Sequence, residues 1–151
     1  MSRALSLTLA TPTRVLVEAL EVIAVRAEDE SGSFGLLPGH TDFITVLPPS
    51  VVRWRTPDDT LHYCAQAGGL LTVEDGSRVA LACRQAILSD DLAVLAQAVE
   101  HMRAAETDRE RKARVEQMRL HAQAVRQLMR FLRPGPEATF ASASAAAEEA
   151  P

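Results

Sequence analysis

Basic side chains are concentrated toward the C-terminal end of this chain. Nine of the sixteen Lys and Arg residues lie between Glu100 and Arg133: Arg103, Arg109, Arg111, Lys112, Arg114, Arg119, Arg126, Arg130 and Arg133. Acidic residues offset the first of these, but no acid lies between Glu116 and Glu137. On a helix, four of the later arginines share one side, and guanidinium groups bind carboxylates and phosphates. These four residues are Arg119, Arg126, Arg130 and Arg133, and we call them the cationic flank.

Two interpretations of the cationic flank follow from its charge. The simpler one is a solvated helix face. The other is a surface for an acidic protein or a phosphate backbone. Nucleic acid fits less well, because the chain carries a net charge of -4 and Phe131 is the only aromatic residue in this segment. A single aromatic side chain makes no stacking platform for successive bases, so we expect no nucleic-acid partner.

Other residue types that could do chemistry lack the spacing that chemistry needs. His40, His62, His101 and His121 are scattered without metal-ligand spacing. Cys64 and Cys83 lie in strand-like runs, which favours buried thiols, no disulfide and a reducing compartment. No phosphate-cradling glycine loop or nucleophile elbow occurs, and the adjacent aspartate pairs suit a turn and a helix start. We expect a non-catalytic protein with no metal and no cofactor.

The basic segment must be carried by helices, because no glycine or proline occurs from Ser77 to Arg133. Ser89 is a candidate N-cap, and an apolar stripe follows at Leu92, Leu95, Val99 and Met102. Thr107 and Glu110 form a capping-box pattern that predicts a second helix start. A second stripe then comprises Val115, Met118, Ala122, Val125, Met129 and Leu132. A short link near Ala105 and Glu106 predicts an antiparallel two-helix hairpin, and a single bent helix is the alternative.

The first half of the chain predicts short strands separated by turn-forming residues. The expected strands are Leu5 to Ala10, Arg14 to Leu16, Leu20 to Ala27, Ile44 to Leu47, Val51 to Trp54, Leu61 to Ala65, Leu70 to Val73 and Val79 to Cys83. This spacing favours a sandwich or barrel. In the last strand, Val79, Leu81 and Cys83 should point into the core.

Two further segments lie outside these elements. Residues 134–151 are rich in Ala and Glu, with too little apolar bulk to pack, so we expect a disordered tail. No apolar run approaches the roughly 20 residues of a membrane span. We therefore expect membrane contact only through partners.

Three glycines and a proline occur within nine residues at Gly32-Ser33-Phe34-Gly35-Leu36-Leu37-Pro38-Gly39-His40, which predicts a loop of defined shape. Together with Ala67-Gly68-Gly69 and the strand from Val79 to Cys83, in this order, the segment resembles the epsilon subunit of bacterial rotary ATP synthases.

This resemblance implies a fold, partners and a location. The fold is an N-terminal β-sandwich over residues 1–88, followed by a C-terminal antiparallel two-helix hairpin over residues 89–133. The sandwich would be a non-catalytic rotor element that couples rotation between the gamma subunit and the c-ring of a proton- or sodium-translocating enzyme. The helices would extend toward the catalytic beta subunit and restrain ATP hydrolysis, with the cationic flank as the regulatory residues. The location implied is peripheral, on the cytoplasmic face of the bacterial inner membrane.

The resemblance also implies site residues. The interface with the ring or gamma would comprise Ser33, Phe34, Leu37, Pro38, Gly39 and His40. Some family members bind ATP at the start of the first helix through an acid and an arginine. Here the aligned positions hold Leu92, Ala93, Val94, Leu95, Ala96 and Gln97, so both groups are absent and no nucleotide is expected there. The segment Gly-Ser-Phe-Gly-Leu-Leu-Pro followed by an arginine-rich helix also resembles the alternate, sodium-translocating branch of the family.

Two other functional classes stay open at this point. One is a sandwich-plus-hairpin adaptor of an unrelated assembly. The other is a nucleic-acid-binding module that uses the basic helix, which predicts an affinity that falls steeply with salt.

Overall fold

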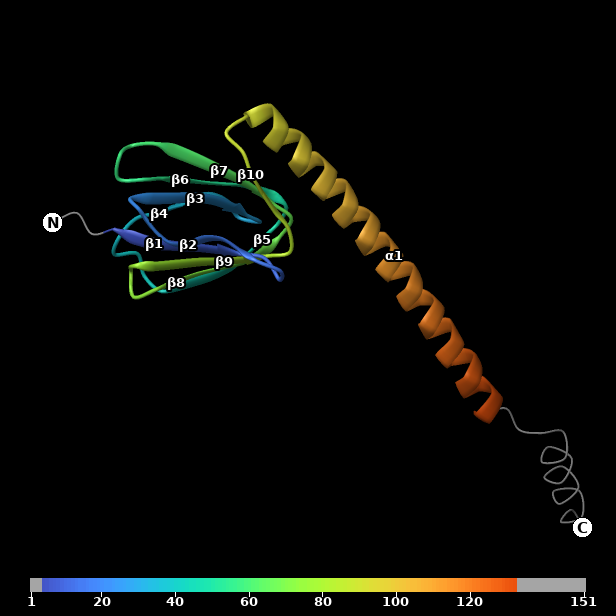
Figure 1. Cartoon of the computed structure of the whole chain (residues 1–151). Coiled ribbons are helices and arrows are strands. Elements are labelled where there is room, and N and C mark those ends of the chain that lie inside the picture. Colours follow the sequence, from blue (N-terminus) through green and yellow to red (C-terminus); the bar gives the residue numbers. More distant parts are fainter. Residues whose placement is uncertain (1–3, 133–151) are drawn as a thin grey trace, which may run out of the picture. The chain divides into compact units, whose positions relative to one another are not determined.

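The computed structural model describes residues 4–132, which form ten strands followed by one helix (Figure 1). The strands are β1 (Leu5–Ala10), β2 (Val15–Val22), β3 (Ala24–Asp29), β4 (Gly32–Leu36), β5 (Phe43–Leu47), β6 (Ser50–Arg55), β7 (Leu61–Gln66), β8 (Gly69–Glu74), β9 (Arg78–Cys83) and β10 (Ala86–Leu88). The helix, α1, runs from Leu92 to Leu132.

The strands form two sheets that pack face to face as a sandwich (Figure 1). The first sheet, sheet A, has the order β2-β1-β9-β8-β5, and the second, sheet B, has the order β10-β7-β6-β3-β4. All pairings are antiparallel except that of β1 with β9, which is parallel. Chain connections therefore cross between the sheets, and β4 and β5 lie at the edges of opposite sheets.

Strict alternation of side chains builds the core between the sheets. Leu5, Leu7 and Leu9 of β1 are buried, and the residues between them point outward. On the neighbouring strand β9, Val79, Leu81 and Cys83 are also buried, which confirms the predicted inward face of this strand.

Both cysteines are free and buried. Burial, together with the nearby Cys83, raises the pKa of the Cys64 thiol to about 12. Burial likewise raises the pKa of Cys83. Since the thiolate is the reactive form, these thiols behave as small core hydrophobes.

Six of the eight predicted strands are observed with similar bounds. The predicted strands Arg14 to Leu16 and Leu20 to Ala27 are divided differently, because β2 runs through Val15–Val22 and a break at Ile23 separates it from β3. Two observed strands were not predicted. β10 is three residues long and pairs with β7. β4 occupies Gly32–Leu36, within the segment that was expected to be a loop, so that expectation is wrong for its first five residues. Pairing along β3 outweighs the weak strand preference of Gly32 and Gly35.

The two-helix hairpin is not observed, because α1 is one continuous helix of 41 residues. At about 1.5 Å per residue it is roughly 60 Å long. Nothing in its sequence interrupts the backbone at the expected link, since Ala104, Ala105 and Glu106 are good helix formers. The Thr107 hydroxyl donates a 3.0 Å hydrogen bond to the Arg103 carbonyl within the helix instead of capping a new one. Of the two alternatives, the single helix is the one observed.

The helix start also differs from the prediction by two residues. Asp91, rather than Ser89, is the N-cap, because its Oδ1 accepts a 2.9 Å hydrogen bond from the Ala93 amide. The Ser89 hydroxyl instead accepts a 3.1 Å bond from the Asp91 amide, which shapes the preceding turn.

The chain divides into two compact units, with the boundary between Asp108 and Arg109. In the first unit, the opening turns of α1 bury Leu95, Val99 and Met102 against Ala65, with Val51, Tyr63 and Ile87 around them. The second unit comprises the rest of α1, residues 109–132, where every described residue is exposed.

Residues 133–151, which include the expected tail and Arg133, lie outside the described part. Within residues 4–132, no helix has an apolar stretch suited to crossing a membrane.

Candidate rotor interface

The segment after β4 forms a tight turn whose geometry its residue types require. The His40 amide donates a 3.2 Å hydrogen bond to the Leu37 carbonyl, so Pro38 and Gly39 are the central residues of a β-turn. Gly39 has φ +87°, which matches the third residue of a type II turn and favours glycine. Proline at the second position fixes the φ that this turn needs.

This turn is anchored to the turn between β8 and β9. The Gly39 amide donates a 2.8 Å hydrogen bond to the Gly76 carbonyl. A Cβ on Gly76, which has φ +63°, would lie 2.9 Å from Gly39 Cα, so no side chain fits between the two turns. The Asp75 amide donates a 2.9 Å bond to the Asp42 carboxylate nearby. The two turns together form one rigid end of the sandwich.

Aromatic rings support the same end of the molecule. Phe43 makes edge-to-face contacts with Phe34 at 5.6 Å and with His40 at 5.7 Å between ring centroids. His40 Nδ1 lies 2.7 Å from the Thr41 carbonyl oxygen, which fixes the imidazole. Because Phe34 and Phe43 also pack against the core, the turn is held from within the sandwich.

The six predicted interface residues therefore separate into two groups. Ser33, Leu37 and Gly39 are exposed, and Leu37 shows 62% of its surface. Phe34, Pro38 and His40 are half-buried. A partner at this turn would touch Leu37 and Gly39, while Phe34 and His40 hold the turn in position. Ser33 lies opposite Glu28, toward the other end of β4.

A carboxylate connects the two sheets at the other end of β4, where β3 ends. Asp29, at the end of β3, accepts a 2.8 Å hydrogen bond from the Thr45 hydroxyl of β5. It also accepts hydrogen bonds from the hydroxyl and amide of Ser31. The bonds from Ser31 first, and from Thr45 second, hold the pKa of the Asp29 carboxyl below its ordinary value.

Sequence reasoning missed the outer face of sheet A, which carries an apolar row across all five strands. Val15 lies opposite Ala10, Ala10 beside Ala82, Ala82 opposite Leu70, and Leu70 opposite Val46. Val15, Leu70 and Val46 are 53%, 41% and 68% exposed. Ile44, 65% exposed, lies on the same side of β5 as Val46. We call these six residues the sheet A apolar row.

A signal for this row was present in the sequence. The segment Phe43-Ile44-Thr45-Val46-Leu47 carries apolar residues at both odd and even positions, whereas a strand with one wet face alternates. Phe43 and Leu47 face the core, and Ile44 and Val46 face outward. A strand that is apolar on both sides predicts a second covering layer.

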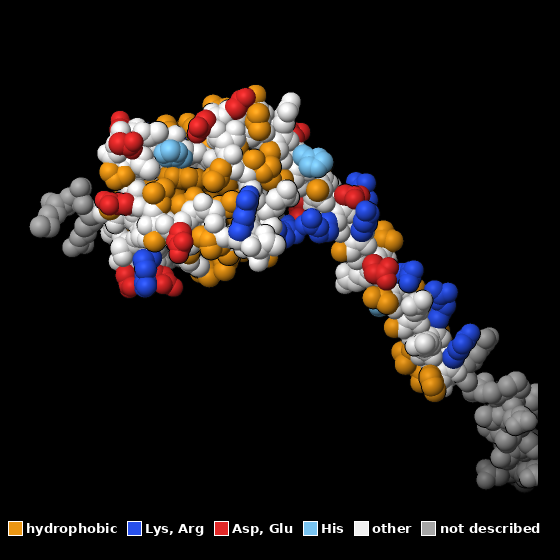
Figure 2. Space-filling view, in the orientation of Figure 1, with side chains coloured by type: hydrophobic (Ala, Val, Ile, Leu, Met, Phe, Trp, Pro, Cys, Tyr) orange, Lys and Arg blue, Asp and Glu red, His pale blue; other side chains and the backbone are white. Residues whose placement is uncertain are grey.

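Three of the four predicted regulatory residues, Arg119, Arg126 and Arg130, lie in the described part of the second unit, and Arg133 lies outside the described residues. Helical geometry puts Arg119, Arg126 and Arg130 along one side of α1, and Figure 2 shows basic and hydrophobic side chains along this part of the helix. Arg119 pairs with Glu116 at 3.7 Å, both largely exposed, which is a weak interaction. Arg126 Nε donates a 3.3 Å bond to the Ala122 carbonyl.

The positions of the missing ATP motif form the first turns of α1. Leu92, Ala93, Ala96 and Gln97 are exposed, and Leu95 is buried against the sandwich. None of these side chains can contribute a charge to a nucleotide. Within residues 4–132, no group of three or more His, Cys, Asp and Glu side chains could hold a metal ion.

Comparison with known proteins agrees with this architecture. The family described as ATP synthase, Delta/Epsilon chain, beta-sandwich domain matches residues 4–89. An ATP synthase epsilon chain 2 of Paraburkholderia xenovorans is 54% identical over 134 residues, covering 89% of this chain and 96% of that protein. An ATP synthase epsilon chain 2 of Cereibacter sphaeroides is 44% identical over the same length, covering 89% and 92%.

Solved structures show the same fold at low sequence identity. A chain in the mitochondrial ATP synthase of Euglena gracilis, solved as its OSCP, F1 and c-ring portion, aligns with a TM-score of 0.57 and 24% identity, covering 69% of this chain and 66% of that one. A chain in the central stalk and c-ring of the Tetrahymena thermophila enzyme aligns with a TM-score of 0.50 and 16% identity, covering 57% and 67%. From the sandwich, the glycine-rich turn and these matches together, the chain belongs to the epsilon-subunit family of F-type ATP synthases.

Proposed function

We propose that this chain is a central-stalk rotor subunit that links the gamma subunit to the c-ring of a proton- or sodium-translocating ATP synthase. It is a structural and regulatory subunit and performs no catalysis itself. The observation that carries the proposal is the pairing of a rigid, exposed turn with an apolar face on the same sandwich. In a rotor both surfaces would be permanently covered.

The sheet A apolar row is the surface that we assign to gamma. Exposed contiguous apolar residues on a sheet face are typical of protein interfaces, and the depletion of charge at an interface core fits this row. We expect the anchored turn at Leu37 to His40 to meet the ring or gamma. Its shape is fixed before any partner binds by Pro38, Gly39 and the adjoining Gly76, which lowers the cost of ordering it on binding. A preformed contact transmits torque without first having to become ordered.

Co-purification with gamma tests this assignment. Val46→Glu puts a charge in the middle of the apolar row, so we expect recovery of gamma with the tagged subunit to fall at least about tenfold. The matched control is Val94→Glu, which changes an exposed valine (45%) on the first turn of α1. Circular dichroism of both variants should match the unmodified chain. Equal recovery of gamma by both variants would show that the apolar row is not the gamma surface.

The second part of the proposal is that the cationic flank restrains ATP hydrolysis by meeting an acidic segment of the catalytic beta subunit. This rests on the exposure of residues 109–132 and on the absence of acids after Glu116 within the described helix. Exposed ion pairs contribute only about 0.2 to 1 kcal/mol each. Four arginines acting additively would contribute roughly 1 to 4 kcal/mol, a change of about fivefold to several hundredfold in the population of an inhibitory state.

A matched pair of double variants tests the restraint. Arg126→Ala with Arg130→Ala should raise ATP hydrolysis by the assembled enzyme about twofold to thirtyfold. Arg111→Ala with Arg114→Ala removes the same charge earlier on the helix, where acids offset it, and should change the rate less. Identical rates for the two doubles at low and moderate salt would leave the cationic flank as a solvated face.

The location proposed is the cytoplasmic side of the bacterial inner membrane, held there through the complex. The two relatives of highest identity named above are bacterial epsilon chains, and this supports the same placement.

A further inference from the structure

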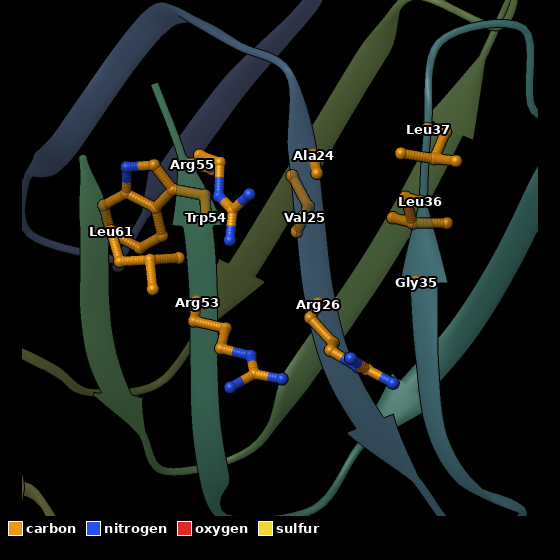
Figure 3. Close-up of a pocket in the computed structure, with 10 residues that line it drawn as sticks. All are labelled: Ala24, Val25, Arg26, Gly35, Leu36, Leu37, Arg53, Trp54, Arg55 and Leu61. Carbon is orange, nitrogen blue, oxygen red and sulfur yellow. The ribbon is translucent and has the colours of Figure 1, made fainter. Parts of the chain in front are cut away.

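Three arginines face outward from the middle of sheet B. Arg26 of β3 lies directly opposite Arg53 of β6, and both are exposed. Arg55 lies two residues farther along β6, on the same face. Figure 3 shows the side chains of Arg53 and Arg26 extending in the same direction, toward β4. At Gly35, opposite Arg26 on β4, the sheet carries no side chain at all.

This arrangement of charge is unfavourable unless something neutralises it. Like charges directly opposite one another on adjacent strands destabilise a sheet. Within residues 4–132 neither Arg26 nor Arg53 has an ion-pair partner, although Glu28 lies on the same face of β3. Arg55 has one at 3.3 Å, the exposed Asp59. Two guanidinium groups therefore lie on neighbouring strands of one face with no ion-pair partner among the described residues.

Two hollows adjoin this pair of arginines, and Arg26 and Arg53 line both of them. The larger, about 460 Å³, is walled by Leu37, Leu61 and Trp54 beside the bare backbone of Gly35. The smaller, about 380 Å³, is lined by Ser33, Tyr63 and the first turn of α1. Both volumes lie in the range of small-molecule sites, and the larger wall is mostly apolar.

We propose that Arg26 and Arg53 bind a small polyphosphate anion, with Arg55 as a third contact and the hollow beside Leu37 and Leu61 receiving an apolar part of the molecule. The guanidinium fork matches phosphate oxygens in a bidentate manner, and paired forks strengthen such contacts. Arg53 and Arg55 lie about 7 Å apart along β6, and Arg26 lies beside Arg53 on β3, so the three cationic groups suit more than one phosphate group. The proposal does not depend on the rotor assignment, because it uses only the free surface of sheet B.

Calorimetric titration of the full chain with inorganic pyrophosphate at low salt tests the site. We expect saturable binding of one pyrophosphate per chain, weakened about tenfold or more in Arg26→Ala and in Arg53→Ala. Arg53→Lys keeps the charge and loses the fork, so it should fall between Arg53→Ala and the unmodified chain. The matched control is Arg78→Ala, which removes an exposed arginine from sheet A and should leave the affinity unchanged.

A second readout needs no ligand. Because Arg53→Ala removes the like-charge pair, its melting temperature without anion should equal or exceed that of the unmodified chain, and pyrophosphate should no longer raise it. Equal weakening by Arg78→Ala would mean general attraction by charge and would overturn the proposal. So would binding only to vesicles of phosphatidylcholine with phosphatidylglycerol, or only to an acidic peptide, with no response to pyrophosphate.

Discussion

The sandwich and the second part of α1 contain similar proportions of apolar residues, but many of these residues are buried in the sandwich and all are exposed in the helix. Leu81 in β9 is 1% exposed, whereas Leu128, Met129 and Phe131 of the helix are 58%, 64% and 89% exposed. A sheet finds its covering layer within the chain, because the second sheet supplies it. Residues 109–132 find no such layer within their own unit. The difference indicates that the core between the two sheets is covered within the chain, whereas the apolar side chains of residues 109–132 are not.

Truncation sharpens this comparison and has the largest expected effect. Ending the chain after Asp108 removes only exposed described residues and should leave the free energy of unfolding nearly unchanged. Ending it after Leu88 also removes Leu95, Val99 and Met102, which are buried against Ala65. At about 1.5 to 3 kcal/mol per buried side chain, the loss would be several kcal/mol, although the strands keep their own core.

Urea unfolding followed by circular dichroism measures the difference between the two truncations. The shorter chain should keep a β-type spectrum and dispersed amide resonances, with a lower midpoint. Equal midpoints would mean that the first turns of α1 add nothing to the sandwich. Absence of any folded spectrum for residues 1–88 would show that the sandwich depends on the helix.

The success of prediction from the sequence also differs between the sandwich and the helix. Alternation in Leu5 to Ala10 and in Val79 to Cys83 predicts strand and face together, because burial on one side imposes a period of two. β4 escapes prediction because Gly32 and Gly35 have a weak strand preference, which hairpin pairing with the adjacent β3 outweighs. The capping pattern at Thr107 and Glu110 misleads because hydroxyl and carboxylate are also tolerated inside a helix when no breaker stops it.

The candidate sites divide in a similar way. The turn at Pro38 and Gly39 is readable from residue types, since each fixes a backbone angle. The outward apolar residues Ile44 and Val46 were also detectable from the sequence, because their strand is apolar on both faces and does not alternate. The pairing of Arg26 with Arg53 could not be predicted from the sequence, because 27 positions separate them and only the register of β3 with β6 brings them together.

Trp54 is the largest aromatic side chain in the core. Its side chain is 3% exposed and stacks on His62 at 6.0 Å, but its indole Nε1 is buried without a partner among the described residues. Trp54→Ala should therefore lower the free energy of unfolding by about 3 to 5 kcal/mol. Trp54→Phe removes the unsatisfied donor along with some volume, so it should cost much less, below about 2 kcal/mol. Equal losses in urea unfolding would mean that the indole nitrogen is hydrogen-bonded in solution.

A matched pair of glycines tests how rigidly the two turns are joined. Gly76→Ala and Gly39→Ala both place a side chain at positive φ, which costs on the order of 1 kcal/mol. At Gly76 the new Cβ would also lie 2.9 Å from Gly39 Cα, whereas at Gly39 it would meet nothing within 4 Å. Thermal unfolding should therefore show the larger drop for Gly76→Ala. A larger drop for Gly39→Ala would mean that the turns do not touch in solution.

The smallest expected effect is a dependence on pH at the link between the sheets. Hydrogen bonds from Ser31 and Thr45 lower the pKa of Asp29 in the folded chain, so folding favours its ionised form. Its contribution to stability is therefore complete above the unfolded pKa of about 4 and is lost as the pH falls through the lower folded value. Asp29→Asn removes this titration. The melting temperature of the variant should therefore fall less between pH 5 and pH 3 than that of the unmodified chain. These pH values lie about one unit above and below the pKa of an ordinary aspartate. Thr45→Val removes one donor and leaves the carboxylate, so it should reduce the same acid-dependent loss in part. Because Asp29 is only half-buried, the difference will be modest. Parallel curves for all three chains would show that the carboxylate does not connect β3 to β5 in solution.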